Sequence, residues 1–337
     1  MKNFTYYRPK TTDEAVALLD AKWGTSELLA GGTDLHDLQK EYIAQPDKVV
    51  SLGGAGLSGI EMLAEGIRIK AGTNLSDMAA DINVRVLLPA LATAAGQIGG
   101  PQIRNMGTLG GNLCQRNRCW YFRDEHVNCL LKSGDKCYAV NGENRYHAVF
   151  TKGHKCVIVH PSTLAPALIA LGATASILGP GGKTRKIHLS EFFRAPSGPG
   201  EREHVLAPNE LVVSVTVPSS LLASTIAPKN ANYEVRHKQS YDWPLVQAAV
   251  AFKYETGTAK NAKIVLGHVA PTPLVSEEAA KAIEGKAITE ESASAAGEAA
   301  AKGASPLSQN AYKVKLIAVA VKRALLTAAG AKKYWEA

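Results

Sequence analysis

The sequence predicts an α+β fold in three units, at about residues 1–55, 56–225 and 226–337. Helix-like and strand-like hydrophobic patterns are mixed along the first two units, whereas long strands followed by alanine-rich helices make up the third. With 337 residues, 46% of them hydrophobic, the chain can bury a full core, and its length indicates two or three domains. No internal repeat and no long linker interrupts this pattern.

The first unit begins with a short helix and two strands. Residues 12–20 have apolar side chains at helical spacing, which predicts a helix with Thr12 as its N-cap. An apolar strand at 28–30 runs directly into Gly31 and Gly32. A further strand is predicted at 48–52.

The second unit contains strands, helices and a glycine-rich stretch. Ser76 predicts the start of a helical segment that Pro89 interrupts. Residues 98–114 hold five glycines and few helix formers, so they are predicted as loop and strand backbone shaped to approach something closely. The other predicted elements are strands at 66–72, 156–160, 173–179 and 210–218, and a buried helix at 164–173.

The third unit has a different pattern. Residues 245–254 and 260–269 predict long strands of an antiparallel sheet. Two alanine-rich helices are predicted in 276–285 and 310–330.

Charge and hydropathy argue against several classes of protein. The net charge of +8 permits nucleic-acid binding, but the basic residues are scattered, so no nucleic-acid partner is expected. The most apolar run, residues 164–178, is too short and glycine-broken to span a bilayer. The start MKNFTYYRPK lacks the apolar core of a signal peptide, so a cytoplasmic location is expected. An odd number of cysteines argues against a disulfide framework.

Two glycine-rich segments are candidates for binding a phosphate group. AGGTDL at 30–35 offers consecutive backbone N–H groups with no Cβ in the way, and GTLGGN at 107–112 offers the same. Neither segment is a Walker A motif or a Rossmann fingerprint. A tight turn explains either segment taken alone, but together they favour a dinucleotide such as FAD.

All five cysteines lie between residues 114 and 156. From Cys119 onward they are separated by ten, eight and nineteen positions, so the close pairs typical of structural zinc are missing. A catalytic thiol needs one activated cysteine rather than several. An iron–sulfur cluster accepts free spacing, and nearby Arg and Lys residues would compensate its charge. Buried core cysteines remain an equal alternative from spacing alone.

Histidines and hydrolytic motifs add little. Because His126, His147, His154 and His160 lie in or beside the cysteine window, a mixed Cys/His site stays open. No nucleophile elbow, HExxH motif or telling carboxylate pair occurs, so hydrolytic chemistry has no candidate residues.

Five motifs in order cover essentially the whole chain: AGGTDL, IRNMGTLGGNLC, HPSTLAPALIALGA, YEVRHKQSYDWPLVQAAV and LGHVAPTP. With these motifs the sequence resembles the FAD-binding subunit of the xanthine dehydrogenase family of molybdenum hydroxylases. The resemblance implies a two-part FAD-binding domain of the vanillyl-alcohol-oxidase (PCMH) type. A C-terminal α+β domain of the CO dehydrogenase flavoprotein type is implied to follow it.

The resemblance also implies a heterotrimeric assembly. A large partner subunit with molybdopterin performs the hydroxylation, and a small partner subunit carries two [2Fe–2S] clusters. The FAD subunit passes their electrons to an external acceptor.

An insertion at about 114–157 precedes His160. It is similar to the branch with the periplasmic aldehyde oxidoreductases and 4-hydroxybenzoyl-CoA reductase, whose FAD subunit holds an additional [4Fe–4S] cluster. This similarity implies that Cys114 is structural. The implied cluster ligands are Cys119, Cys129, Cys137 and Cys156.

Further site residues are implied by position. Ile98 and Val212 are implied to lie near the flavin or its ribityl chain. The Thr163 hydroxyl stands where relatives commonly have Asp, and Glu234, which replaces a frequent Lys, is not assigned to the flavin. The implied cofactor-binding residues are Leu28, Leu29, Ala30, Gly31, Gly32, Thr33, Asp34, Leu35, Ile98, Thr108, Leu109, Gly110, Gly111, Asn112, Thr163 and Val212.

The function predicted from the resemblance is that of an oxidoreductase subunit that transfers electrons, with an aldehyde as the preferred substrate of the complex over an aromatic or N-heterocyclic one. A zinc-stabilised, non-enzymatic interaction module and a stand-alone flavin oxidase remain alternatives. No substrate-binding constellation is evident in the chain itself, which favours a subunit. Export together with a signal-bearing partner would leave no trace in this sequence.

Overall fold

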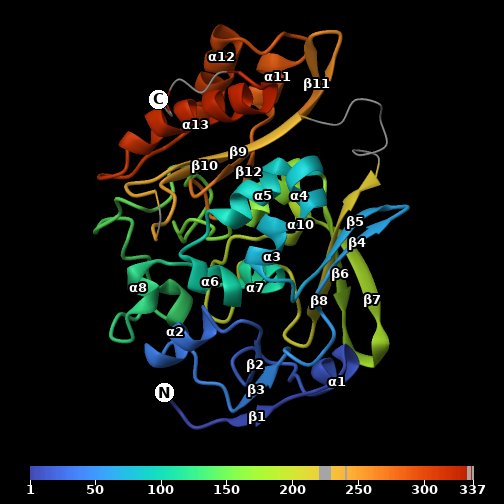
Figure 1. Ribbon diagram of the computed structural model, residues 1–337. Helices are drawn as coiled ribbons and strands as arrows, with labels where there is room; N and C mark the ends of the chain where they lie inside the picture. The colour runs from blue at the N-terminus through green and yellow to red at the C-terminus, as the bar shows by residue number, and fades with distance from the viewer. Residues whose placement is uncertain (220–228, 240, 332–334, 336–337) are drawn as a thin grey trace.

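The computed structural model describes residues 1–219, 229–239, 241–331 and 335. Within these residues three sheets follow one another in chain order along the molecule (Figure 1). A three-stranded sheet lies near the N-terminus, a five-stranded sheet in the middle and a four-stranded sheet near the C-terminus. The mixture of helices and sheets agrees with the predicted α+β class. The unit boundaries near residues 55 and 225 stay a prediction.

The N-terminal sheet is parallel, with strand order β1-β3-β2. The Thr11 hydroxyl accepts a hydrogen bond from the backbone N–H of Glu14, so the cap of α1 is Thr11 and not the predicted Thr12. After β2, residues 30–34, here called the glycine loop, lead directly into α2. The elements of this layer are β1 (Thr5–Tyr7), α1 (Thr12–Ala17), β2 (Ser26–Leu29), α2 (Leu35–Lys40) and β3 (Lys48–Ser51).

The middle sheet is antiparallel, with strand order β4-β5-β8-β6-β7. Ile67 and Ile69 of β5 and Val215 and Val217 of β8 are fully buried, because alternate residues of each strand point into the core. The strands are β4 (Ile60–Leu63), β5 (Gly66–Lys70), β6 (Thr174–Leu178), β7 (Thr184–His188) and β8 (Leu211–Pro218).

Several short helices pack beside the middle sheet. Residues 98–114, predicted as loop and strand, instead contain two helices. Pro101 stands at the first turn of one, and the Thr108 hydroxyl caps the other, so these start signals outweigh the glycine content. The helices are α3 (Leu75–Ala80), α4 (Ile82–Leu87), α5 (Pro89–Gly96), α6 (Pro101–Met106), α7 (Leu109–Cys114), α9 (Leu164–Ala170), α10 (Leu189–Phe192) and the 3-10 turn η2 (Pro180–Gly182).

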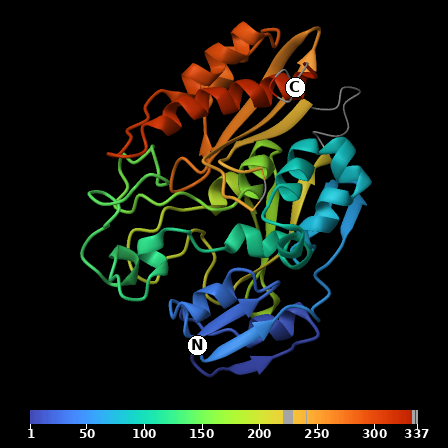
Figure 2. The ribbon, with the colours of Figure 1, turned by 60° about the vertical axis from the view of Figure 1, so that its left-hand side comes forward.

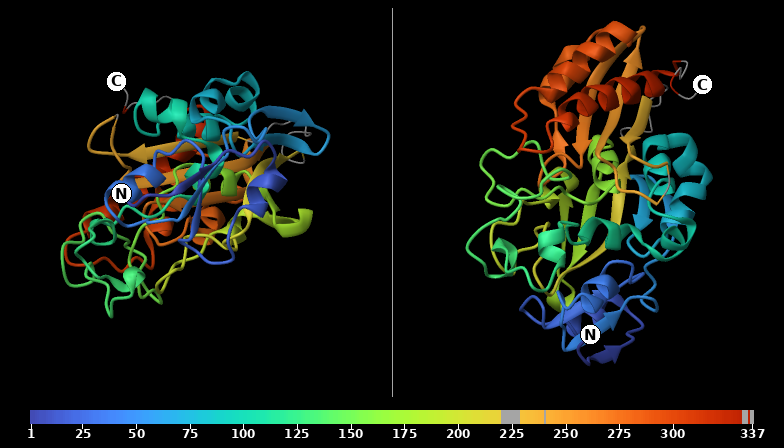
Figure 3. Two further views of the ribbon diagram at one scale, coloured as in Figure 1. Left: turned by 90° about the horizontal axis from the view of Figure 1, so that it is seen from below. Right: turned by 90° about the vertical axis from the view of Figure 1, so that its left-hand side faces the viewer.

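The cysteine-rich insertion lies at the side of the middle layer, where Figures 2 and 3 show it as green loops. Its two short helical elements are α8 (Trp120–Arg123) and η1 (Leu130–Lys132). Residues 156–160, predicted as a strand, form no strand; instead Val157 O accepts from Ala148 N–H and His160 N–H donates to Ala270 O. Isolated hydrogen bonds to neighbouring loops replace the expected ladder.

The C-terminal sheet is antiparallel, with strand order β12-β11-β10-β9. Helices α11, α12 and α13 cover one face, and α5 and α9 contact the other (Figure 1). Helix α12, which the sequence patterns did not predict, packs on α13 where a Cβ on Gly297 would lie 2.3 Å from Ala318 O. The elements are β9 (Lys229–Val235), β10 (Val246–Glu255), β11 (Thr258–Gly267), β12 (Leu274–Val275), α11 (Glu277–Ile283), α12 (Glu290–Ala301) and α13 (Tyr312–Ala329).

The longest helix is α13, at 18 residues. Among the described residues, none of the helices combines the length and apolar character that crossing a bilayer requires.

Candidate functional site

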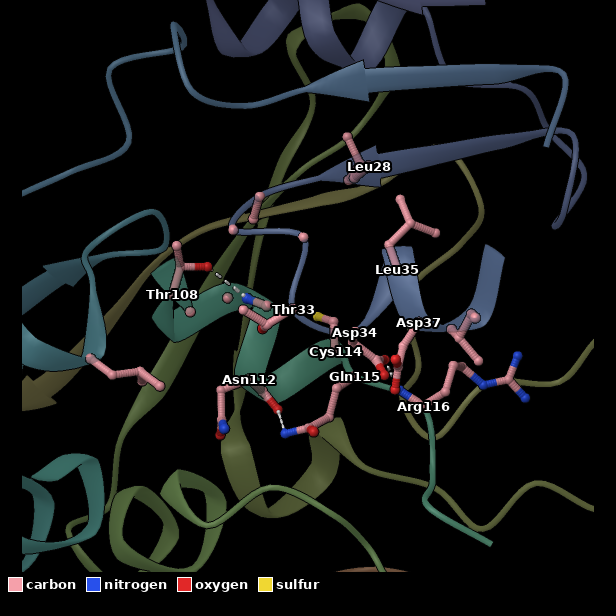
Figure 4. Close-up of a pocket in the computed structure, with 18 of the residues that line it drawn as sticks. Leu28, Thr33, Asp34, Leu35, Asp37, Thr108, Asn112, Cys114, Gln115 and Arg116 are labelled. Atoms are coloured by element: carbon pink, nitrogen blue, oxygen red, sulfur yellow. Dashed lines mark hydrogen bonds between the residues drawn. The ribbon is translucent and has the colours of Figure 1, made fainter. Parts of the chain in front are cut away.

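A cavity of about 520 Å³ opens beside the glycine loop (Figure 4). Its walls come from this loop, from the start of α7, from residues 97–100 before α6 and from residues 241–244 of the C-terminal part. All three predicted units therefore contribute to one cavity.

The first glycine wall follows β2. A Cβ on Gly31 would lie 1.7 Å from the backbone oxygen of Met106, so no side chain can stand there unless the backbone moves. Gly32 has a φ of +74°, and a Cβ on it would lie 2.5 Å from the His36 ring. Gly31 thus requires glycine for steric reasons, and the positive φ of Gly32 favours glycine there.

The second glycine wall is the start of α7. The Thr108 hydroxyl accepts a hydrogen bond from Gly111 N–H at 3.1 Å, which Figure 4 shows as a dashed line. A Cβ on Gly110 would lie 3.0 Å from the Cβ of Ala71, so Gly110 allows α7 to pack closely against the residue that follows β5. A Cβ on Gly111 would lie 3.8 Å from Ala30 Cβ, so the two glycine walls are within van der Waals reach of each other.

Two facing walls of bare backbone are suited to a dinucleotide diphosphate held by main-chain groups rather than by lysine. The predicted residues that line the cavity are Leu28, Ala30, Gly31, Gly32, Thr33, Asp34, Leu35, Ile98, Thr108, Gly110, Gly111, Asn112, Thr163 and Val212. Of the remaining two, Leu109 is fully buried in the core and Leu29 pairs with Ser51 in the sheet. The roles of all sixteen residues in binding FAD stay predictions.

The four cysteines assigned by resemblance lie near one another in the insertion. The thiols of Cys137 and Cys156 are within hydrogen-bond distance, and Cys119 interacts electrostatically with Cys129 and Cys137. Cys129 and Cys156 are buried in a small apolar cluster against which Cys119 packs. Cys114, by contrast, belongs to α7 and lines the cavity.

Backbone N–H groups point at several of these sulfur atoms. Those of Tyr121 and Phe122 donate to Cys119, although burial still raises the Cys119 thiol pKa to about 12. The hydrogen bond from Cys156 lowers the pKa of Cys137 to about 6, with help from three backbone N–H groups. Neighbouring thiols, two of them buried, that accept from backbone N–H groups are a donor set that suits an iron–sulfur cluster. In the described part of the chain, no three His, Cys, Asp or Glu side chains are arranged to hold a single metal ion.

The histidines of this region have different surroundings. The His147 ring nitrogen Nε2 lies 3.2 Å from Cys119 Sγ, and burial lowers the pKa of His147 to about 4. His126 and His154 are exposed, and His160 is buried against Phe193. Only His147 therefore keeps the mixed Cys/His possibility open.

Both parts of the chain match families of known proteins. Residues 2–220 match the FAD binding domain in molybdopterin dehydrogenase, and residues 231–328 match the CO dehydrogenase flavoprotein C-terminal domain. This chain belongs to the FAD-binding family of the molybdopterin dehydrogenases.

Similar proteins cover most of this flavoprotein. The aldehyde oxidoreductase FAD-binding subunit PaoB of Escherichia coli (strain K12) is 37% identical over 275 residues, which cover 81% of this chain and 83% of PaoB. The carbon monoxide dehydrogenase medium chain of Hydrogenophaga pseudoflava is 30% identical over 328 residues, or 96% of each chain. A solved structure of carbon monoxide dehydrogenase from Hydrogenophaga pseudoflava matches with a TM-score of 0.75 at 29% identity and covers 97% of both chains.

These matches confirm the predicted family, the fold class, the binding of FAD and the assignment to an oxidoreductase as one of its subunits. They leave the cluster-bearing branch of the family untested. The [4Fe–4S] cluster and its four ligands therefore stay a prediction.

The cavity includes residues that sequence reasoning missed. Gly99 has a φ of +51°, and a Cβ on Gly100 would lie 2.1 Å from the Tyr241 ring. Both glycines line the cavity, and the pair in IGGPQ was the available signal.

Glu234, which stands where relatives frequently have lysine, belongs to a buried ion pair. Burial raises the pKa of Glu234, and the opposing influence is its salt bridge with Arg236, whose Nε donates to the carboxylate at 2.8 Å. Arg236, not Glu234, lines the cavity. Glu234 thus partners the cavity-lining arginine and supplies no positive charge of its own.

Proposed function

We propose that this flavoprotein is the FAD- and [4Fe–4S]-containing electron-transfer subunit of a heterotrimeric molybdenum hydroxylase. In this proposal it takes electrons from a molybdopterin-containing large subunit by way of a small subunit with two [2Fe–2S] clusters. It then delivers them to an external acceptor. The similarity to subunits and medium chains of such enzymes supports this assembly.

One observation carries the cluster proposal: four cysteines lie near one another, and backbone N–H groups donate to the sulfur atoms of Cys119 and Cys137. In this proposal the insertion at 114–157 holds the cluster with Cys119, Cys129, Cys137 and Cys156. The glycine walls hold the FAD diphosphate. FAD and the cluster supply the redox chemistry when bound, and the chain supplies their positions and electrostatic surroundings.

An aldehyde is the proposed substrate class of the complex. The relative that is 37% identical over 81% of this chain is named an aldehyde oxidoreductase subunit. Other similar chains are named for carbon monoxide, xanthine or nicotinate dehydrogenases, but with lower identity or over about a third of this chain. The substrate would bind to the large partner subunit, so the present chain carries no proposed catalytic residue.

The cluster can be tested in the complex purified anaerobically with its partner subunits. In Cys129→Ser the iron content should fall by about four atoms per complex, because one cluster is lost, while the FAD absorbance stays. Cys114→Ser removes a thiol next to the insertion and should leave the iron content unchanged. Zinc in place of iron, or equal iron in wild type and Cys129→Ser, would refute the ligand assignment. Aldehyde turnover by the lone polypeptide would favour a stand-alone oxidase instead.

A further inference from the structure

Asp34 was expected to contact the cofactor, but its carboxylate is turned toward the cysteine-rich insertion. It occupies the N-cap position of α2 without accepting a hydrogen bond from that helix. Instead, Oδ2 accepts from Arg116 N–H at 2.8 Å, and Oδ1 lies 2.6 Å from Arg123 Nη2 and 3.1 Å from Arg118 Nη2. An Asp at an N-cap usually bonds its own helix, so another demand fixes its side chain here.

The arginines around Asp34 are themselves held in place. Arg116 pairs with Glu203, which is fully buried, at 2.8 Å. Arg123 Nε donates to Asn117 O at 2.9 Å, and its Nη2 also donates to Arg116 O. Contacts other than the one with Asp34 therefore also orient these arginines, which makes the geometry of their hydrogen bonds to Asp34 specific.

The same network reaches a proposed cluster ligand. The Asn117 side chain donates to Glu203 Oε1 at 2.7 Å and accepts from Cys119 N–H at 3.1 Å. One continuous set of hydrogen bonds and ion pairs thus runs from the glycine loop through Asp34 and the arginines to Cys119. Residues 82 to 89 positions apart in the sequence are joined by it.

We propose that Asp34 is a positioning residue that couples the two cofactor sites. The arginines of the insertion, acting through Asp34, hold the glycine loop in the shape that binds the FAD diphosphate. Because such coupling is reciprocal, bound FAD also holds the insertion in the shape that retains the cluster. This inference rests on the proposed function, since it assumes that the insertion carries iron.

The first test measures the affinity for FAD of the deflavinated complex by flavin fluorescence titration. Asp34→Asn should weaken FAD binding about tenfold or more. Glu41→Gln removes a charge from the exposed C-terminal end of the same helix and should change affinity less than about twofold. An affinity of Asp34→Asn within twofold of wild type overturns the proposal.

A variant at Arg123 distinguishes a positioning role of Asp34 from a direct contact between Asp34 and FAD, because Arg123 is not one of the residues that line the cavity. Arg123→Gln should weaken FAD binding severalfold although its side chain does not line the cavity. The double variant Asp34→Asn with Arg123→Gln should be no weaker than the poorer single variant. Fully additive losses would mean that Asp34 contacts FAD directly, which would also overturn the proposal. If Asp34→Asn fails to fold, Arg123→Gln alone still decides the result.

The second test measures how fast a chelator removes iron from the complex. Only the iron of the proposed cluster is counted, which is the difference between the iron content of wild type and that of Cys129→Ser. Removal of FAD should accelerate this loss at least threefold in wild type and leave it unchanged in Asp34→Asn. An iron-loss rate that is independent of FAD in wild type contradicts the coupling. Absence of this iron from wild type refutes the proposed cluster instead, whereas the affinity measurements still test the positioning role of Asp34.

Discussion

Around the cavity, strands and capped helices fix the backbone, whereas the insertion beside it consists of irregular chain with the short elements α8 and η1. The glycine walls are shaped by close contacts with other backbone, such as that of Gly31 with Met106. The insertion is shaped by polar side chains and by contacts at its sulfur atoms. One site is thus formed by backbone packing, whereas the other is formed by polar side chains and thiols.

This difference predicts how each site responds to damage. A site made by backbone packing should fail when a side chain intrudes. A site made by polar contacts and thiols should lose its order when its ligand is removed. The experiments on Gly31 and on iron removal below each test one half of this comparison.

The largest effect is expected from Gly31→Ala. A Cβ would overlap Met106 O, and backbone cannot move aside as a flexible side chain can, so the purified protein should retain almost no FAD. Gly198→Ala is the matched control, because a Cβ there meets no atom within 4 Å, and it should retain FAD fully. Flavin absorbance per chain measures both. Normal FAD content in Gly31→Ala would show that the glycine wall is not shaped by steric contact.

The ion pair between Glu234 and Arg236 should give the next largest effect. Glu234→Ala leaves the buried Arg236 without its partner, which typically costs about 3–5 kcal/mol of stability. Glu278→Ala breaks an exposed pair with Lys281 and should cost less than about 1 kcal/mol. Denaturant unfolding of the full chain compares the two. Equal losses would mean that burial does not decide the strength of these pairs.

Removal of iron should loosen the insertion and leave the sheets intact. The amides of Tyr121 and Phe122 donate to Cys119, so their hydrogen-exchange protection should fall about 100-fold after chelation. The amide of Val215, in the ladder between β5 and β8, should keep its protection. Equal protection of Tyr121 and Phe122 with and without iron would show that the insertion is as preformed as the cavity.

The sequence predicts the cavity better than its surroundings for a physical reason. The need for glycine at Gly31 and Gly32 is local, and it is visible where a strand runs into two glycines. The helix α7 was missed because its two glycines hide the cap signal of Thr108. Arg236 was missed because its link to Glu234 depends on which side chains the strand buries.

The network around Asp34 lies beyond sequence reasoning. Its partners Arg116 and Arg123 are 82 and 89 residues away, and no local pattern sets that pairing. The four cysteines could be grouped by resemblance but not by spacing, because an irregular insertion can bring any of them together. Local rules thus predict sites made of backbone, and long-range polar contacts need the structure.

The smallest expected effect concerns His160, where the insertion returns to the regular fold. Burial lowers its pKa to about 4, while the same histidine in the unfolded chain titrates near 6.5. Between these values the unfolded chain binds more protons, so the stability present above pH 6.5 is lost as the pH falls toward 4. Between pH 7.5 and 5.5 this one group should cost about 1.4 kcal/mol.

Comparison of His160→Gln with wild type isolates that contribution. The variant starts from a different stability, but its loss between pH 7.5 and 5.5 should be smaller than that of wild type by about 1.4 kcal/mol, because glutamine does not titrate. If His160→Gln keeps the full loss, His160 takes up its proton over the same pH range in the folded and the unfolded protein. The surroundings of His160 would then be accessible to water. In that respect His160 would resemble the insertion and not the regular part of the chain.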